Sequence, residues 1–311
     1  MNHRRELPVL LAVWAALLAL FGLLSPHFFS QASLSSLANR LPALAMVCSG
    51  MTLVMVTGGI DLSVGSLLGL CGVIAGGLMT QAGWSLLPAL VVAVLVGAAA
   101  AGLTGLLAAR FDLPSFIVSL GMLEVARGAA FWLSDSRTQY IGGAIEVLAR
   151  PLAGLGLSPA LLLAAAAVVF SHGLLRQHRL GRQWVAVGAN AQAAKLSGLE
   201  LNRPRILAHA LLGGLTGLAA VVNASRLGSA DPNAGVGFEL SVIAAVVVGG
   251  TSLSGGRGHV LQSLLGVLII ATVEAGLAQQ GVSEPSKRVI TGLVIVLAVL
   301  AQRWRRPHSS P

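Results

Sequence analysis

The sequence predicts an all-α integral membrane protein with about ten transmembrane helices, some of them short or broken, and a helix-bearing loop on the cytoplasmic side. Apolar residues make up 55% of the 311 residues and charged residues only 10%, whereas an ordinary soluble domain has about 25% charged residues. Apolar stretches of about 20 residues recur along the whole chain. No stretch resembles a soluble domain, so residues 1–311 are expected to form one transmembrane domain.

Ten apolar stretches are the expected spans. The first follows two arginines and is interpreted as an uncleaved span, because no small-residue cleavage site comes after it. The second and the eighth are short or interrupted by glycine, which favours broken or re-entrant helices. The ten ranges are 7–24, 41–56, 62–80, 86–109, 115–134, 159–175, 206–224, 240–251, 260–281 and 289–301.

The positions of Lys and Arg predict the orientation. With a cytoplasmic N-terminus, most of the 20 Lys and Arg fall on the cytoplasmic side, including those in loop 176–205 and Arg305 and Arg306. Ten spans then place both termini in the cytoplasm, although Lys287 and Arg288 lie on the unfavoured side. The net charge of +9 therefore reflects topology. A nucleic-acid partner is not expected, because no basic stretch is interleaved with aromatic residues.

The sequence lacks the patterns of catalytic and cofactor sites. Cys48 and Cys71 lie in apolar stretches and have neither disulfide nor metal-site spacing. No phosphate-binding G-x-x-x-x-G-K-[ST] loop, nucleophile elbow or H-E-x-x-H pattern occurs. The chain is therefore expected not to be an enzyme, with no catalytic, cofactor-binding or metal residues of its own.

A carboxylate and several glycines interrupt the apolar sequence at residues 58–66. Asp61 follows a glycine pair that ends one apolar run and precedes the next, which predicts a helix N-cap. A second interpretation places Gly58, Gly59, Asp61, Ser63 and Gly65 beside a solute path, where broken helices form a cavity. The two interpretations are compatible.

A second glycine-rich stretch, GGTSLSGG at 249–256, is similar to GGIDLSVG at 58–65. Transporters often contain repeated halves, but the match is short and duplication stays open. Gly249, Gly250, Thr251 and Ser252 are further path candidates. Glu274, near the outer end of its span, is expected to reach the interface, to meet another helix or to line the path.

One span carries two opposite charges. Glu124 and Arg127 are three residues apart, so they share one face of a helix and can pair. Pairing lowers the cost of placing charges in the membrane. The spacing favours a structural pair over a proton relay.

The longest polar and basic interruption is RLGRQWVAVGANAQAAKLSGL, residues 179–199. Its Ala-rich part predicts a short helix over 191–199, with Asn190 as N-cap and Gly198 near its end. The pattern alone allows either a plain connection or a docking element.

Four stretches together resemble the membrane permease subunits of bacterial ribose-type sugar ATP-binding cassette (ABC) importers, whose wider family includes branched-chain amino acid permeases. The resemblance runs from about residue 25 to 301, with the motifs in family order. The stretches are GMTLVMVTGGIDLSVGSLLGL (50–70), LPSFIVSLGMLEVARG (113–128), LGRQWVAVGANAQAAKLSGL (180–199) and AAVVVGGTSLSGGRGHVLQSLLGVLI (244–269).

The resemblance implies one permease domain in the bacterial inner membrane, paired with a second permease copy, identical or different. A cytoplasmic ATP-binding subunit would bind ATP and Mg²⁺, and a periplasmic sugar-binding protein would deliver a monosaccharide such as a pentose or hexose. Loop 176–205 becomes the coupling loop. Its candidate residues are Gly188, Asn190, Ala193, Ala194, Lys195, Ser197 and Gly198.

The sequence departs from the sugar-permease pattern at two places. Related permeases often have an uncharged amide where this chain has Glu274, and an aromatic loop where it has the charged EPSKR at 284–288. Two alternatives stay open. One is a self-sufficient, ion-coupled secondary transporter that uses these charges, and the other is an ABC permease for a nucleoside or an amino acid.

Overall fold

A computed structural model of the chain describes residues 3–152 and 157–304, so Arg305 and Arg306 lie outside the described residues. The described part is mainly helical, with one antiparallel pair of two-residue strands in which Gln139 pairs with Ala230. The elements are α1 (His3–Leu24), α2 (Gln31–Val56), α3 (Val64–Thr80), α4 (Leu86–Arg110), α5 (Ser115–Leu133), β1 (Gln139–Tyr140), α6 (Gly143–Glu146), α7 (Pro159–Gln177), α8 (Arg179–Ala189), α9 (Ala191–Leu196), α10 (Asn202–Leu227), β2 (Ser229–Ala230), α11 (Phe238–Val248), α12 (Val260–Gln279) and α13 (Glu284–Trp304).

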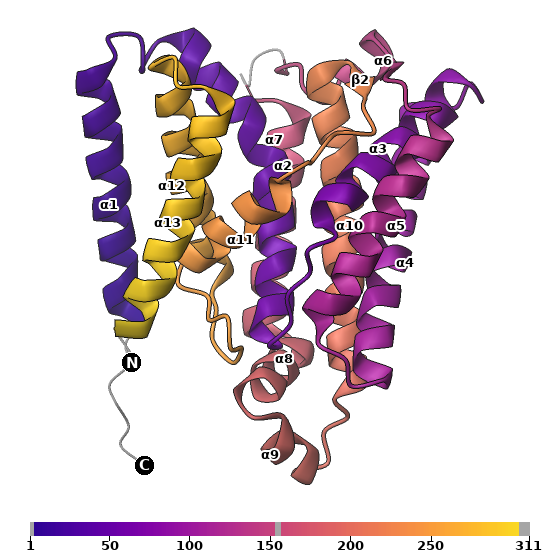
Figure 1. Cartoon of the computed structure of the whole chain (residues 1–311), viewed down its shortest axis with the longest axis vertical. Helices are drawn as coiled ribbons and strands as arrows, with labels where there is room; N and C mark the ends of the chain where they lie inside the picture. Colours follow the sequence, from indigo (N-terminus) through magenta and orange to yellow (C-terminus); the bar gives the residue numbers. More distant parts are fainter. Residues whose placement is uncertain (1–2, 153–156, 305–311) are drawn as a thin grey trace.

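The long helices stand side by side, and the smaller elements mark the two ends of the bundle (Figure 1). Helices α8 and α9 project beyond one end, here called the α9 end. The strands and α6 lie at the opposite end, here called the strand end. Helix α1 begins and α13 ends at the α9 end, so the chain enters and leaves the bundle on the same side. This arrangement requires an even number of crossings.

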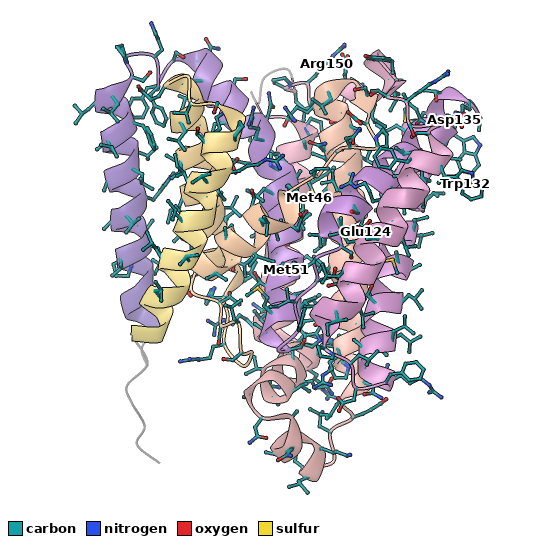
Figure 2. All side chains as sticks on the ribbon, in the orientation of Figure 1. Met46, Met51, Glu124, Trp132, Asp135 and Arg150 are labelled. Carbon is teal, nitrogen blue, oxygen red and sulfur yellow. The ribbon has the colours of Figure 1, made fainter. Side chains whose placement is uncertain are left out.

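Helix α2 is the centre of the bundle and α1 is at its edge. In the apolar window of α2 83% of the residues are buried, against 6% in α1. Met46 and Met51 of α2 lie among the neighbouring helices, whereas Trp132 at the end of α5 points away from the bundle (Figure 2). The exposed apolar side chains of the outer helices form the surface expected to face lipid.

Helices α4 and α10 approach each other main chain to main chain. A side chain on Gly97 would overlap the carbonyl oxygen of Gly213, and one on Gly217 would overlap that of Ala93. Small residues at such crossings allow van der Waals packing between helices in lipid, where the hydrophobic effect does not drive helices together.

Each of the ten predicted spans coincides with a helix, namely α1 to α5, α7 and α10 to α13. Seven described helices are long and apolar enough to cross a membrane. Helices α3 and α11 have only 17 and 11 residues. Both begin inside the bundle (Figure 1). The short α11 confirms the prediction for the eighth span, whereas the shortness of α3, at the third span, was not predicted.

The prediction of a short or glycine-interrupted second span was wrong. Helix α2 has 26 residues and begins at Gln31, where the hydroxyl of Ser30 accepts the first-turn N–H of Ser33 at 3.3 Å. Gly50 leaves the helix continuous. A Cβ at this position would lie 2.9 Å from the Cα of Leu212, so Gly50 allows close contact with α10.

Candidate functional site

Two non-helical segments meet in the middle of the bundle, at the first turns of the short helices. Residues 57–63 lead into α3, and residues 231–237 lead into α11. A side chain on Gly65 would overlap the carbonyl oxygen of Gly235, and a side chain on Gly235 would overlap that of Gly65. The two helix starts therefore touch through their main chains, so a movement of one acts directly on the other.

Asp61 lies in the first of these segments and is fully buried. Its Oδ1 accepts hydrogen bonds from the amide of Ser63 at 2.8 Å and from the Ser63 hydroxyl at 2.5 Å. Ser63, two residues later, is the N-cap position of α3. The prediction of Asp61 as the N-cap was therefore wrong, because its carboxylate holds the cap residue and not a first-turn amide of the helix.

Two serines of α5 explain why the chain stays non-helical through Asp61. The Ser115 hydroxyl accepts the N–H of Ile60 at 2.9 Å, and the Ser119 hydroxyl accepts the N–H of Leu62 at 3.0 Å. These bonds satisfy amides that would otherwise need helical partners. The segment is thus attached to the first two turns of α5.

Arg127 does not pair with Glu124 in the described part of the chain. Its Nη1 donates to the carbonyl oxygens of Pro232 and Ala234, the latter at 3.0 Å. Glu124 is exposed on α5 (Figure 2). The predicted ion pair was wrong, because the segment before α11 passes close to α5 and offers carbonyl groups to the guanidinium. Arg127 attaches this segment to α5.

At the α9 end, three segments meet in a contact here called the glycine junction, formed by Gly58, Gly188, Gly255 and Gly256. A side chain on Gly188 would overlap the carbonyl oxygen of Val56 and would lie 2.6 Å from the amide nitrogen of Gly256. The Gly256 amide also donates to the Val56 carbonyl at 2.9 Å. The predicted coupling loop thus touches both glycine-rich stretches.

The two similar glycine-rich stretches end their helices in the same way. Gly58 after α2 and Gly250 after α11 have φ of +85° and +88°. In each case the following amide, of Gly59 or Thr251, donates to a carbonyl five residues earlier, as in a Schellman motif. In the structure Gly58 corresponds to Gly250. The alignment of the two sequence stretches instead pairs Gly58 with Gly249, so the two matches differ by one residue. The similarity is one of helix ends, and duplication of whole halves stays a prediction.

The path candidates that follow α11 form packing contacts. Thr251 is fully buried, and its hydroxyl lies 3.3 Å from that of Ser263, which accepts from the Thr52 hydroxyl at 2.8 Å. A Cβ on Gly249 would lie 2.6 Å from the Cα of Ser263, and the Ser252 side chain is 5% exposed. A role of these residues in a solute path stays a prediction.

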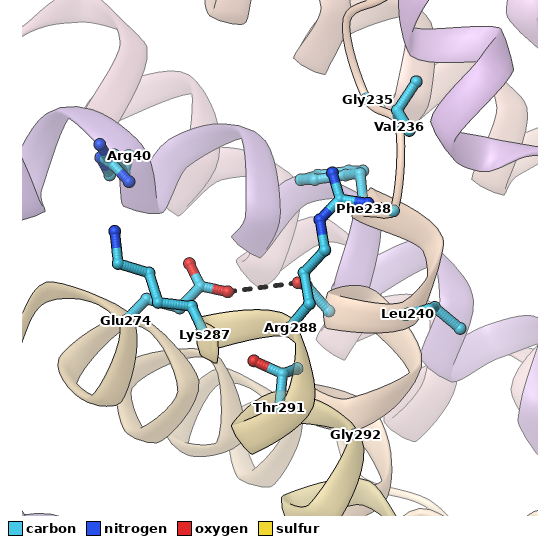
Figure 3. A pocket seen from close by; sticks show the side chains of 12 residues that line it. Arg40, Gly235, Val236, Phe238, Leu240, Glu274, Lys287, Arg288, Thr291 and Gly292 are labelled. Atoms are coloured by element: carbon cyan, nitrogen blue, oxygen red, sulfur yellow. Dashed lines mark hydrogen bonds between the residues drawn. The ribbon is translucent and has the colours of Figure 1, made fainter. Parts of the chain in front are cut away.

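Glu274 lines a cavity of about 360 Å³ together with residues from α2, α11 and α13. Three basic side chains, Arg40, Lys287 and Arg288, lie around it (Figure 3). The Glu274 Oε1 accepts a hydrogen bond from Ser241 at 3.2 Å. This space, here called the basic cavity, brings together the two places where the sequence departs from the sugar-permease pattern. The sequence analysis missed Arg40, because nothing in the sequence places it near the others.

A second cavity, of about 270 Å³, lies at the α9 end. Gly58 and Gly59 line it, together with residues of the α4–α5 connection and the start of α10. His209 also faces it, and its Nδ1 lies 2.9 Å from the carbonyl oxygen of Arg205. Two of the predicted path residues therefore border an open space. The remaining candidates of the 58–66 stretch, Asp61, Ser63 and Gly65, are buried deeper, at the start of α3.

The predicted coupling loop contains two helices, α8 and α9, and the sequence analysis foresaw only α9. Asn190 caps α9 as predicted, since its side-chain oxygen accepts the Ala193 amide at 3.0 Å. Gly198 follows the last turn with φ of +82°. Helix α8 is anchored by the fully buried Trp184, whose indole N–H donates to the Pro204 carbonyl at 2.8 Å.

The surface of α9 has one inward and one outward side. Ala194 faces the protein and is 6% exposed, whereas Ala193, Lys195 and Ser197 are exposed. Leu196 is 90% exposed, which is unusual for a large apolar side chain outside the apolar bundle. The sequence analysis missed Leu196. The loop also contains apolar residues that are buried, such as Trp184 and Val187, so the sequence alone did not single out Leu196 as the exposed one.

These features define an α-helical membrane transport protein, with a bundle of spans, two short helices that begin inside it, a polar cavity and a helical loop projecting from one end. The family described as "Branched-chain amino acid transport system / permease component" matches residues 33–299. The chain belongs to this family. The predicted ABC-permease resemblance is thereby confirmed.

Among the proteins to which this chain is similar are sugar import permeases. The ribose import permease protein RbsC of Escherichia coli K12 is 36% identical over 300 residues, covering 93% of this chain and 91% of the relative. The RbsC protein of Bacillus subtilis is 35% identical over 92% of this chain and 89% of its own length. The L-arabinose permease protein AraH of Azospirillum brasilense is 35% identical over 94% and 86%. No solved structure matches the chain.

Proposed function

We propose that this chain is the membrane-spanning subunit of an ABC importer that moves a monosaccharide or a related sugar into the cell. The similarity to ribose and arabinose import permeases along more than nine tenths of the chain supports the solute class. ATP and Mg²⁺ would bind to a separate cytoplasmic subunit, and a periplasmic binding protein would deliver the sugar. A second permease copy would complete the pore in the bacterial inner membrane.

The observation that carries this proposal is the attachment of the α8–α9 loop to the glycine junction. Gly188, at the end of α8, lies against the end of α2 and the loop after α11 with no room for a side chain. A displacement of the α8–α9 loop would therefore be transmitted directly to the end of α2 and to the loop after α11. ATP binding would favour one arrangement of these helices and ATP hydrolysis the other, because each state binds the partner differently.

The proposed orientation places the α9 end in the cytoplasm. Six basic residues of the loop lie there, which fits the excess of Lys and Arg on the cytoplasmic side of membranes. Both chain ends then lie on that side as well. The six are Arg176, Arg179, Arg182, Lys195, Arg203 and Arg205.

The exposed face of α9 would be the surface that docks on the ATP-binding subunit. Leu196 would enter an apolar pocket of the partner, and Ala193 and Lys195 would lie beside it. The adjacent groove between α8 and the residues after α9, lined by Arg179, Arg182 and Gly198 among others, offers a polar rim. Interfaces commonly combine an apolar anchor with such a rim.

The test is to purify the complex gently from its native membrane and identify its subunits by intact-complex mass spectrometry. We expect an ATP-binding subunit together with two permease chains. Leu196→Glu should leave the protein inserted but remove the ATP-binding subunit and ATP-driven uptake, and Leu196→Met should retain both. Full ATP-driven uptake by Leu196→Glu would contradict the docking role, and uptake driven by an ion gradient alone would contradict the ABC assignment.

A further inference from the structure

The basic cavity carries more positive than negative charge. Of the side chains that line it, Arg40, Lys287 and Arg288 are cationic and Glu274 is anionic. The three cations come from two different helices, α2 and α13, and lie on different sides of the opening (Figure 3). Arg40 and Arg288 are exposed and Lys287 is half-buried, so the three cations border one cavity that is open to the outside.

The position of Arg288 adds to this positive potential. A Cβ on Gly237, the N-cap residue of α11, would lie 3.9 Å from the Cζ of Arg288. The N-terminus of a helix is itself positive, and Glu239 is the acidic residue in the first turn of α11. Gly237 provides no side-chain cap.

The described charges near the basic cavity do not all line it. Glu239, in the first turn of α11, does not line the cavity, because its Oε2 lies against Gly65 of α3. Arg226, at the end of α10, adds a repulsive electrostatic interaction with Arg40. Among the side chains that the structure describes, no ion pair is found for Arg40 or Arg288. Among the described side chains, Arg40 and Arg288 therefore offer an incoming anion two guanidinium groups.

The size of the cavity fits a small hydroxylated molecule. Binding pockets begin at about 300 Å³, and the basic cavity has about 360 Å³. Hydroxyl-bearing lining residues, Ser241 and Thr291, and the Glu274 carboxylate offer partners for sugar hydroxyl groups. Glu274 lies five residues before the end of α12, about 8 Å along the helix axis, so the cavity lies in the half nearer the strand end.

We propose that the basic cavity binds an anionic, hydroxylated solute, a sugar acid or a sugar phosphate, during its passage through the membrane. The anionic group would lie between Arg40 and Arg288, with Lys287 at the rim, and the hydroxyl groups would bind Glu274 and Ser241. This inference rests on the proposed function, because it names the charge class of the imported sugar.

The test measures ligand-dependent thermal unfolding of the full chain in nanodiscs of zwitterionic phosphatidylcholine. The probes are glucuronate, ribose 5-phosphate and, as the neutral control, glucose. A ligand that binds only the folded protein raises the unfolding temperature with concentration. We expect at least one of the two anionic probes to do so at millimolar concentration, and glucose to have no effect.

Two variants test whether the cavity is the site. Arg288→Gln should weaken binding of the effective anion about tenfold, the usual loss for a hydrogen bond to a charged group. Arg137→Gln, which removes an exposed cation beyond the end of α5, should leave binding unchanged. An unchanged affinity in Arg288→Gln, an equal effect of glucose, or no effect of either anion would overturn the proposal.

A lipid phosphate is the other possible source of the anion. In nanodiscs that contain phosphatidylglycerol, stabilisation that depends on Arg288 without any effect of the soluble anions would assign the cavity to a lipid head group and contradict the solute. The assay needs no ATP-binding subunit, so its failure is separate from that of the proposed function. Anion binding without an associated ATP-binding subunit would retain the site and reject the importer.

Discussion

The glycine junction and the basic cavity lie in opposite halves of the bundle and differ in the groups that form them. In the glycine junction, main chain meets main chain, with Gly188 against Val56 and Gly256. In the basic cavity, charged side chains surround about 360 Å³ of open space. A close-packed contact transmits displacement because it has no room to yield, whereas an open polar space admits a ligand. Under the two proposals above, the α9 end would transmit movement and the basic cavity would bind the solute.

The largest effect is expected at the glycine junction. Gly188→Ala places a methyl group on the Val56 carbonyl, and overpacking of this kind costs about 1 to 3 kcal/mol. We expect a lower unfolding temperature and loss of ATP-driven uptake. Thermal unfolding of the purified chain and an uptake assay in vesicles measure the two effects.

The matched control is Gly173→Ala in α7, where a Cβ would have no neighbour within 4 Å. Alanine is favoured over glycine inside a helix by up to about 1 kcal/mol, so this variant should be as stable as the parent or more stable. If the two variants have the same unfolding temperature and the same uptake, the contact at Gly188 has room for a methyl group. The glycine junction would then not be more closely packed than the rest of the bundle.

A smaller effect on uptake is expected at Arg127, between the two ends of the bundle, because the variant removes hydrogen bonds but places no new atom in an occupied position. Arg127→Met keeps an unbranched, flexible side chain but is shorter than arginine and removes both hydrogen bonds to residues 231–237. Leaving such carbonyl groups without a donor costs about 1 to 3 kcal/mol. Amide hydrogen exchange should become faster in residues 231–237 and stay the same in α4.

Arg137→Met is the control for Arg127→Met, because Arg137 is exposed. If exchange in residues 231–237 is the same in Arg127→Met as in the parent, Arg127 does not hold this segment. The start of α11, which forms one wall of the basic cavity, would then be fixed by other contacts.

The smallest effect is expected for a hydroxyl in the basic cavity. Ser241→Ala removes one hydrogen bond to Glu274, of 3.2 Å, and in an open cavity water replaces it. Ser263→Ala removes a buried hydroxyl that lies 2.8 Å from the Thr52 hydroxyl, between α2 and α12. A hydrogen bond is worth about 0.5 to 1.5 kcal/mol, and we expect the Ser263 variant to lose more stability. A larger loss for Ser241→Ala would mean that the cavity is as tightly packed as the core.

Residues 57–70 show what a local sequence pattern can predict and what it cannot. The glycine pair and the carboxylate predicted a break between two helices, and the structure has one between α2 and α3. The cap was assigned to the wrong residue, because Ser115 and Ser119 of α5 satisfy the amides around Asp61. Those two serines lie more than 50 residues away in the chain, and no local pattern contains them.

The predicted coupling loop shows the same difference between what neighbouring residues and what tertiary packing determine. Asn190, Gly198 and the Ala-rich stretch predicted α9 and its cap, because capping depends on neighbours within a few residues. The burial of Ala194 and the exposure of Leu196 depend on how α9 lies against α8. Sequence therefore located the loop, and packing decided which of its residues are free to bind a partner.

The sequence by itself determined the membrane class, the ten helices at the predicted spans and the shortness of the eighth, because these depend on composition, periodicity and local motifs. The family was predicted from four stretches that resemble sugar permeases. Only the tertiary structure decided which charges meet. Arg127 shares a helical face with Glu124 but donates to residues 231–237, and Arg40 joins Lys287 and Arg288 across more than 240 residues. The physical reason is that a charge in a membrane protein must find polar groups wherever the packed helices place them, and that placement is a property of the whole fold.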